Sequence, residues 1–175
     1  MPATTDALIM LYVDTAAIIG LDPTDTSQTN LDAIADCCIL SSNHTDPQSP
    51  TEGSNDPNSR RNFETDLKNN SQIAWVGAVQ DIENNRNDYV LISDIVIVPS
   101  QDGIGIIKGN PLPGDRPGRG FQPSSGRTHI DGIVRQNPPP GGNGSVTEYK
   151  LVFTVCHGQN VKDGYQIDPK LKMNN

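Results

Sequence analysis

The sequence has few charged residues, few aromatic residues and only three cysteines. Charged residues make up 19% of its 175 positions and aromatic residues 5%. Three cysteines, of which Cys37 and Cys38 are adjacent, do not make a disulfide framework, so we expect three reduced thiols. The net charge is −8, with no stripe of lysine or arginine to offset it. An acidic surface repels nucleic-acid phosphates and anionic lipids, which argues against both kinds of partner.

The sequence also lacks a long apolar run. The first apolar run, Ala7–Val13, is followed at once by Asp14. It is well short of the roughly 20 apolar residues of a membrane span. The residues before it, Met1–Asp6, contain no basic side chain and do not resemble a targeting segment. We therefore expect a cytoplasmic protein.

The polarity comes instead from Asn, Asp, Ser, Thr, Gly and Pro. The 16 glycines and 14 prolines are turn formers, and they separate short apolar segments that read as strands. The pattern predicts an all-β, antiparallel β-sandwich of immunoglobulin-like or cupredoxin-like topology, formed by one domain over residues 1–175. The expected strands are Ala7–Val13, Asp36–Ser42, Asn62–Leu67, Gln72–Gly77, Tyr89–Val98, Ile104–Lys108, Arg127–Arg135 and Val146–His157.

Long irregular segments are expected near residues 43–60, 109–126 and 136–145. The first of them exceeds the usual limit of about 12–15 residues for a connection without structure, which indicates a functional or mobile loop. Between the third and fourth strands, residues 68–71 have the composition of a hairpin or a tight corner. Trp75, which follows, is expected in the core; a sugar-stacking role is the alternative.

The run Tyr89–Val98 is apolar on both faces except at Ser93 and Asp94. This pattern fits a strand covered on both sides, or one interrupted by a bulge at those two residues. The cover would be the long loops or a second subunit. Asp94 as a catalytic acid is not favoured, because no histidine or second carboxylate accompanies it in a recognisable pattern.

Cys156 and His157 make the C-terminal run 149–173 a candidate metal loop. A copper site of the cupredoxin type needs two histidines and a cysteine that face one point. Consecutive residues of a strand point to opposite faces, so Cys156 is expected opposite the core face that is formed by Tyr149, Leu151, Phe153 and Val155. His129 and His44 are the other candidate ligands. Asp168-Pro169 is expected to end the last strand of this closing hairpin.

Other binding motifs are incomplete. Asp22, Asp25 and Asp32 lack the alternation and the glycine of a calcium loop, and helix caps and turns explain them better. Residues 114–120 are rich in glycine, but Pro113, Pro117 and Pro123 exclude the helix that a phosphate-binding loop requires. No nucleophile motif accompanies the three histidines, so we expect a protein that is not an enzyme. We assign no catalytic, cofactor-binding or metal-ligating residue.

The order of several short motifs resembles the PixA/AidA family of bacterial inclusion-body proteins over most of the chain. They are a first strand that ends in Val-Asp-Thr, a strand pair that ends at a tryptophan, a long apolar strand, a Tyr-x-Leu-x-Phe strand and a closing Gly-Tyr-x-x-Asp-Pro: residues 12–15, 63–75, 89–98, 149–153 and 164–169. The loops 43–59 and 99–126 have no counterpart in this pattern. The resemblance implies a stress- or stationary-phase-associated protein of intracellular inclusions, and it transfers no functional residue.

Three functions follow as hypotheses. The first is a non-enzymatic, self-associating β-sandwich that forms homo-oligomers. The second is a carbohydrate- or small-ligand-binding module that uses loops around exposed aromatics such as Phe121 or Tyr165. The third is a cupredoxin-like metalloprotein that uses Cys156 with His157, His129 or His44.

Overall fold

The computed structural model describes residues 7–43, 63–68, 70–97, 102–108, 128–134, 141–142 and 144–173. The expected long loops near 43–60 and 109–126 lie almost wholly outside these residues, and the loop near 136–145 lies partly outside them. His44 and Phe121 also lie outside the described residues. Within the described ranges the chain is mostly β-strand, which confirms the predicted β class. Neither of the two helices found there has the length and apolar run that a membrane span needs.

The described elements begin with β1 (Ala7–Val13), α1 (Thr15–Ile18), α2 (Gln28–Asp36) and β2 (Cys38–Ser42). Two strands joined by a short corner follow, β3 (Glu64–Leu67) and β4 (Gln72–Val79), and then the long β5 (Tyr89–Ile97). The remaining strands are β6 (Ile106–Lys108), β7 (Thr128–Val134), β8 (Val146–His157), β9 (Asn160–Ile167) and β10 (Lys170–Met173).

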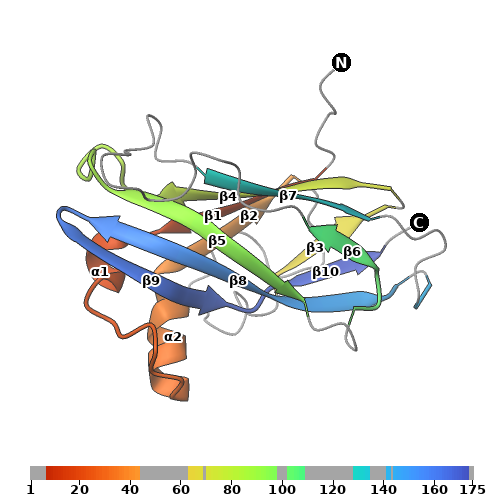
Figure 1. Cartoon of the computed structure of the whole chain (residues 1–175), viewed down its shortest axis with the longest axis horizontal. Helices are drawn as coiled ribbons and strands as arrows, with labels where there is room; N and C mark the ends of the chain where they lie inside the picture. The colour runs from red at the N-terminus through yellow and green to blue at the C-terminus, as the bar shows by residue number, and fades with distance from the viewer. Residues whose placement is uncertain are drawn as a thin grey trace.

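These strands form two sheets. The first has the order β2-β1-β4-β7-β6, and the second has the order β3-β10-β8-β5, with β9 also paired to β8 (Figure 1). The sheets are mixed, so the expectation of a purely antiparallel fold was wrong: β1 runs parallel to β4, and β3 runs parallel to β10. The chain reaches these parallel neighbours by leaving a sheet and returning to it, an order that the strand pattern alone does not reveal.

One hydrophobic core lies between the sheets. It draws Leu11 and Trp75 from the first sheet and Tyr149, Leu151 and Phe153 from the second. Trp75 is fully buried, as predicted. Its Nε1 donates a 3.1 Å hydrogen bond to the hydroxyl of Tyr149, and the two rings meet edge to face at 5.9 Å. This pair ties the two sheets together and satisfies both polar atoms in the dry interior.

The connection from β3 to β4 is a corner between the sheets and not a hairpin. β3 pairs with β10 in the second sheet, whereas β4 pairs with β1 and β7 in the first. Further along β4, the backbone of β5 passes so close to Gly77 that a Cβ there would lie 2.7 Å from the carbonyl oxygen of Val90. Only glycine permits this approach of one sheet to the other.

Two bulges interrupt the second sheet. The β5–β8 register shifts between Ile92 and Asp94, which confirms the bulge predicted at Ser93-Asp94. The β8–β9 register shifts between Phe153 and Val155, where Asp163 and Gly164 face one residue of β8. Gly164 has a φ of +90°, which a residue with a side chain would adopt only under strain.

Asp168-Pro169 does not end the last strand, contrary to the expectation. Pro169 has no N–H to donate, so the ladder breaks after Ile167, but the chain continues along the same edge of β8 as β10. The carbonyl of Pro169 still accepts from the N–H of Tyr149, which keeps β9 and β10 aligned. β8 is therefore flanked by two consecutive strands on one side and by β5 on the other.

Helix α2 and its C-cap take up the first two residues of the predicted strand Asp36–Ser42. Residues 28–36 form α2, with Ser27 as N-cap and Cys37 as C-cap, so β2 starts at Cys38 and not at Asp36. The aspartates before α2 do make turns, as expected: Asp22 accepts from the backbone N–H of Thr24. All three cysteines lie among the described residues, and none is part of a disulfide.

Candidate functional site

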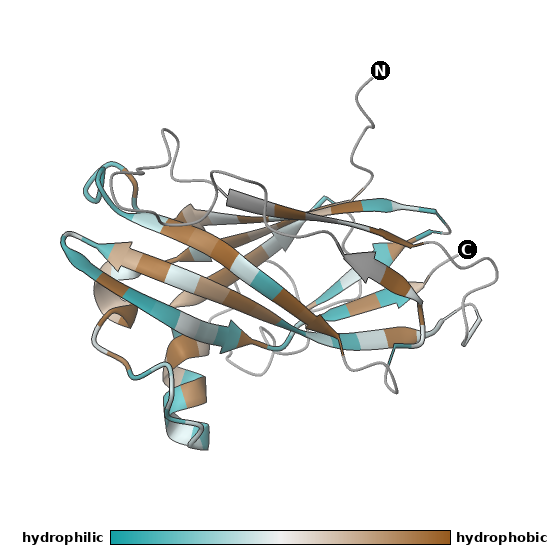
Figure 2. Cartoon of the chain, viewed as in Figure 1, coloured by the Kyte–Doolittle hydropathy of each residue, from teal (hydrophilic) through white to brown (hydrophobic). Residues whose placement is uncertain are grey.

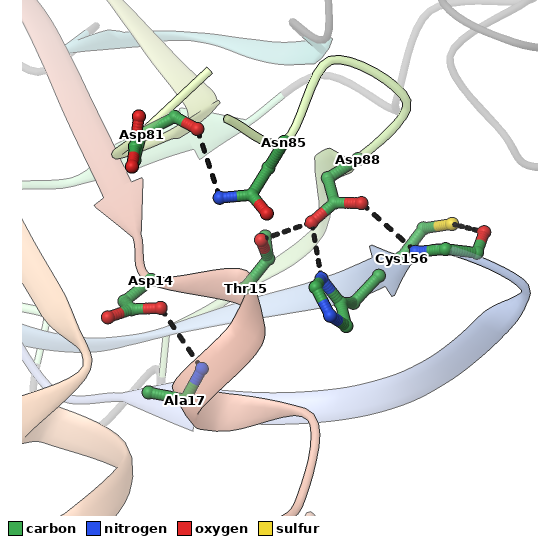
Figure 3. Close-up of polar contacts among 9 residues, drawn as sticks. Asp14, Thr15, Ala17, Asp81, Asn85, Asp88 and Cys156 are labelled. Atoms are coloured by element: carbon green, nitrogen blue, oxygen red, sulfur yellow. Dashed lines mark hydrogen bonds and ion pairs between the residues drawn. The ribbon is translucent and has the colours of Figure 1, made fainter. Parts of the chain in front are cut away.

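The most highly connected polar group near the predicted Cys156-His157 pair is the carboxylate of Asp88. It lies where the turn after β4 enters β5, and its side chain is only 5% exposed. One oxygen accepts from the hydroxyl of Thr15 at 2.5 Å and lies 2.6 Å from Nδ1 of His157. The other oxygen accepts from the N–H of Gly158 at 3.0 Å (Figure 3). We call Asp88, Thr15 and His157 the Asp88 cluster.

Local sequence positions each member of the cluster. Asp14 caps the N-terminus of α1 through the N–H of Ala17, which fixes Thr15 at the first helical position. The turn that delivers Asp88 is held by the carbonyl of Asp81, which accepts from the N–H and the side-chain amide of Asn85 (Figure 3). Three segments distant in sequence thus converge on one buried carboxylate.

Asp88 is held as an anion. Its burial raises the pKa of the carboxyl, but the bonds from Thr15, Gly158 and His157 outweigh this effect and leave the pKa below its ordinary value. An ionised carboxylate accepts and cannot donate, so three donors satisfy it well. The His157 side chain is 34% exposed, which leaves part of the imidazole open to solvent while Nδ1 faces Asp88.

The cluster does not complete a catalytic triad. An aspartate behind a histidine orients the ring, but the histidine must then face a nucleophile. The hydroxyl of Thr15 donates to Asp88 itself, on the same oxygen that His157 contacts. The arrangement therefore joins α1, the β4–β5 turn and the β8–β9 turn as a structural clamp.

Cys156 lies on the side of β8 opposite the core face, as strand parity predicted. It packs with Tyr89 and Leu91 in a small group apart from the main core. Burial raises the pKa of the Cys156 thiol, the hydrogen bond with Tyr89 opposes that rise, and the charge of Asp88 adds to it. Burial and the neighbouring thiol raise the pKa of Tyr89 to about 12. A thiol with a raised pKa is a weak nucleophile and a poor metal ligand.

Of the other two candidate ligands, His44 lies outside the described residues and His129 is described by its backbone alone. No three His, Cys, Asp or Glu side chains lie close enough to hold a metal ion in the part of the chain that the structure describes. The backbone of His129 lies in β7, which belongs to the other sheet from His157. Asp94 accepts from the N–H of Ile95 at the bulge of β5, a structural role.

Tyr165 is not the exposed aromatic that a sugar-binding surface would need. It is fully buried, and its ring stacks on Phe153 with centroids 5.8 Å apart. Its hydroxyl donates to the carbonyls of Ile18 and Leu21, just after α1. Lys162 reaches the same carbonyl of Leu21 through its Nζ. β9 therefore holds the C-terminal end of α1, as Asp88 holds its beginning.

These contacts give two of the motifs a structural role. Asp14 and Thr15 close the Val-Asp-Thr motif at the start of α1, and Tyr165 of the Gly-Tyr-x-x-Asp-Pro motif binds its end. Sequence reasoning missed the role of Asp88. A signal was present: the turn 81–88 ends in an aspartate directly before the longest apolar strand.

A small cavity lies elsewhere, between α2, β2 and the end of β9. Its volume is about 110 Å³. The residues that line it are Gln28, Leu31, Ala35, Cys38, Leu40, Gln166, Ile167 and Asp168.

The described residues thus define a two-sheet, mostly β protein in which helix α1 is held at both ends. No protein-family model matches the sequence, and no curated protein matches it. Among solved structures, the crystal structure of the inclusion body protein PixA from Burkholderia cenocepacia J2315 is similar, with a TM-score of 0.54 and 12% sequence identity. That match covers 98% of this chain and 96% of the other. At this identity the likeness shows a shared fold.

The solution structure of Amebosin is a weaker match. It has 13% identity and a TM-score of 0.28, over 63% of this chain and 88% of that one. A superposition of this quality does not define a common fold.

Proposed function

We propose that this chain is a non-enzymatic, cytoplasmic protein of the inclusion-body kind, a two-layer β-sandwich that associates with copies of itself. The observation that carries the proposal is the fold shared with the PixA inclusion body protein over nearly the full length of both chains. The motif order described above supports the same family. A surface on the second sheet supports self-association independently.

That surface is the outer face of the second sheet, the side turned away from the core. Val146 lies on it because it is in register with the outward-facing residues of β8. Val96 is paired with Lys150, and Val161 is paired with Cys156, and paired residues share a face. Among the described residues, Val96, Val146 and Val161 are three of the four large hydrophobic side chains exposed to solvent, at 39%, 40% and 48%.

Charges of both signs accompany the valines. Lys150 and Asp163 are exposed on the same face, on β8 and β9. In a two-fold symmetric pair, each residue of one copy meets a different residue of the other, so a face with both signs can complement itself. Near β3, by contrast, the cations of this face are already engaged: Lys170 with Glu148 at 3.1 Å and Lys172 with Glu64 at 3.3 Å.

The strand edge at β9 is less suited to association than the face. The bulge at Asp163 and Gly164 disturbs the regular ladder that an added strand would need. Asp163 also accepts a 2.6 Å hydrogen bond from Thr154, which fixes the bulge. Figure 2 shows β9 as a largely hydrophilic strand beside the more apolar β8. We therefore infer contact face to face.

Size-exclusion chromatography with light scattering tests the proposal. The wild-type protein should have a mass above that of one chain, and this mass should rise with loading concentration. Val96→Lys combined with Val161→Lys should shift the protein toward the monomer, because each change places a charge in the apolar contact.

Ile82→Lys is the matched control. Ile82 is the remaining exposed hydrophobic of the set, at 46%, but it lies in the turn between β4 and β5 and not on the sheet face. This variant should associate like the wild type. A strict monomer at every concentration would refute self-association, and an equal effect of all the lysine changes would refute the assignment to this face.

A further inference from the structure

The cavity between α2, β2 and β9 has walls and a rim of different chemistry. Its walls are apolar, since Leu31 and Ala35 come from α2, Leu40 from β2 and Ile167 from β9, with the thiol of Cys38 beside them. Gln28, Gln166 and Asp168 contribute its polar groups. Sites for small molecules commonly combine an apolar interior with a few polar groups that fix orientation.

The volume limits the size of the occupant. An apolar protein cavity of about 150 Å³ holds one benzene molecule. At about 110 Å³, this cavity has room for a body slightly smaller than benzene, such as the four carbons of an isobutyl group. A sugar ring with its hydroxyl groups is too large and too polar for these walls.

The rim determines the charge of the occupant. Asp168 is exposed and carries a carboxylate, and none of the described residues that line the cavity is cationic. One N–H of Gln28 Nε2 donates to Asp32 at 2.9 Å, and the carbonyl oxygen of Gln28 is an acceptor. The rim therefore offers acceptors and a second nearby carboxylate, a combination that attracts a cationic donor and repels an anion.

We propose that this cavity binds a small primary ammonium compound with a branched aliphatic body, the body against Leu31, Leu40 and Ile167 and the ammonium group at Asp168. Binding involves no covalent step. The site lies on residues that self-association does not use, so the two proposals can fail separately.

Titrations followed by amide NMR spectra test the proposal with three compounds that share one body. Isoamylamine should shift the amide signals of residues around the cavity, such as Leu31, Cys38 and Ile167, and the shifts should saturate with a Kd on the order of millimolar, as expected for so few atoms. Isoamyl alcohol should bind more weakly, and isovalerate should leave these signals unchanged. Equal saturation by isovalerate and isoamylamine would overturn the proposal, as would shifts with no focus at the cavity.

Two substitutions locate the site. Ala35→Leu should fill the cavity and abolish the shifts with isoamylamine, whereas Ala16→Leu, on the exposed side of α1, should preserve them. Asp168→Asn should weaken isoamylamine by about two- to fivefold, the range of exposed ion pairs, and leave isoamyl alcohol unchanged.

Asp168 is exposed, so its substitution tests the site even where Ala35→Leu disturbs folding, which circular dichroism would reveal. Full affinity for the amine in Asp168→Asn, or in a folded Ala35→Leu protein, would contradict the assignment.

Discussion

The two faces of the second sheet differ in chemistry, and β8 contributes side chains to both of them. On the inner face, Tyr149, Leu151 and Phe153 are at most 2% exposed and contact the core of the other sheet. On the outer face, Thr154 lies between Ser93 at 2.9 Å and Asp163 at 2.6 Å, in a polar chain across three strands. The inner face holds the fold together, whereas the outer face exposes Val96, Val146 and Val161 and buries a small group around Cys156. Substitutions at neighbouring positions of one strand should therefore have very different effects.

Phe153→Ala should have the largest effect on stability. Phe153 is fully buried and stacks on Tyr165, so its truncation leaves a cavity and should lower the free energy of unfolding by about 3–5 kcal/mol. Urea denaturation measures this loss. Val152→Ala, at the adjacent half-buried outer position, is the matched control and should cost far less. Similar losses in the two variants would contradict the contrast between the faces.

Asp88→Asn should have the next largest effect. Asp88 is buried and binds Gly158 in the turn that follows β8. The amide cannot accept from all three donors, so the free energy of unfolding should fall by about 1.5–3 kcal/mol, the range for hydrogen bonds to charged groups. Amide hydrogen exchange should increase in α1, whose first turn Thr15 anchors. Glu83→Gln, at an exposed position of the same turn, is the control and should leave both stability and exchange nearly unchanged. Unchanged exchange in α1 would contradict the clamp.

Asp88→Asn should also differ from the wild type in its sensitivity to acid. The pKa of Asp88 in the folded protein lies below its ordinary value of 3.8. The contribution of this group to stability is therefore complete above the unfolded pKa and is lost as the pH falls through the folded pKa. On acidification through that window, the wild type should lose more stability than Asp88→Asn. Denaturation curves at a series of pH values measure this, and parallel losses would show that Asp88 is not the titrating group.

Thr154→Val should have a smaller effect. The change keeps the shape of the side chain but removes its bonds to Ser93 and Asp163, which should cost about 0.5–1.5 kcal/mol. Ser93 and Asp163 are exposed and can bind water instead. Urea denaturation of Thr154→Val and Phe153→Ala, measured under the same conditions, compares adjacent residues on opposite faces. A loss as large as that of Phe153→Ala would mean that the outer face also carries the fold.

The valine substitutions should have the smallest effect on stability. Exposed positions usually change the free energy of unfolding by no more than about 0.5 kcal/mol. Val96→Lys with Val161→Lys should therefore unfold at nearly the same urea concentration as Ile82→Lys, measured at a protein concentration where all are monomeric. A large loss would show that the valines stabilise the single chain rather than an assembly.

Strand parity made the inner face of β8 predictable from the sequence. Alternation at Tyr149, Leu151 and Phe153 placed these residues in the core, and it placed Cys156 on the opposite side. The bulge at Ser93-Asp94 was predictable because two polar residues interrupt an apolar run. Such features depend on local pattern, which a sequence displays directly.

The Asp88 cluster was not predictable in the same way. Thr15 and His157 are 73 and 69 positions from Asp88, and no local pattern relates residues at such separations. Tyr165 was expected at the surface, but the bulge at Gly164 shifts the register of β9 and the tyrosine lies in the core under α1. The mixed order of the sheets was likewise set by long-range pairing.

The most direct test of the central claim is to measure which side chains lose contact with solvent as the protein concentration rises. A soluble paramagnetic probe broadens the NMR signals of exposed methyl groups. We expect Val96, Val146 and Val161 to become protected from the probe at high concentration, whereas Ile82 should stay accessible. If all four remain equally accessible while the protein associates, the outer face of the second sheet is not the contact. If the protein never associates, the proposed function is wrong.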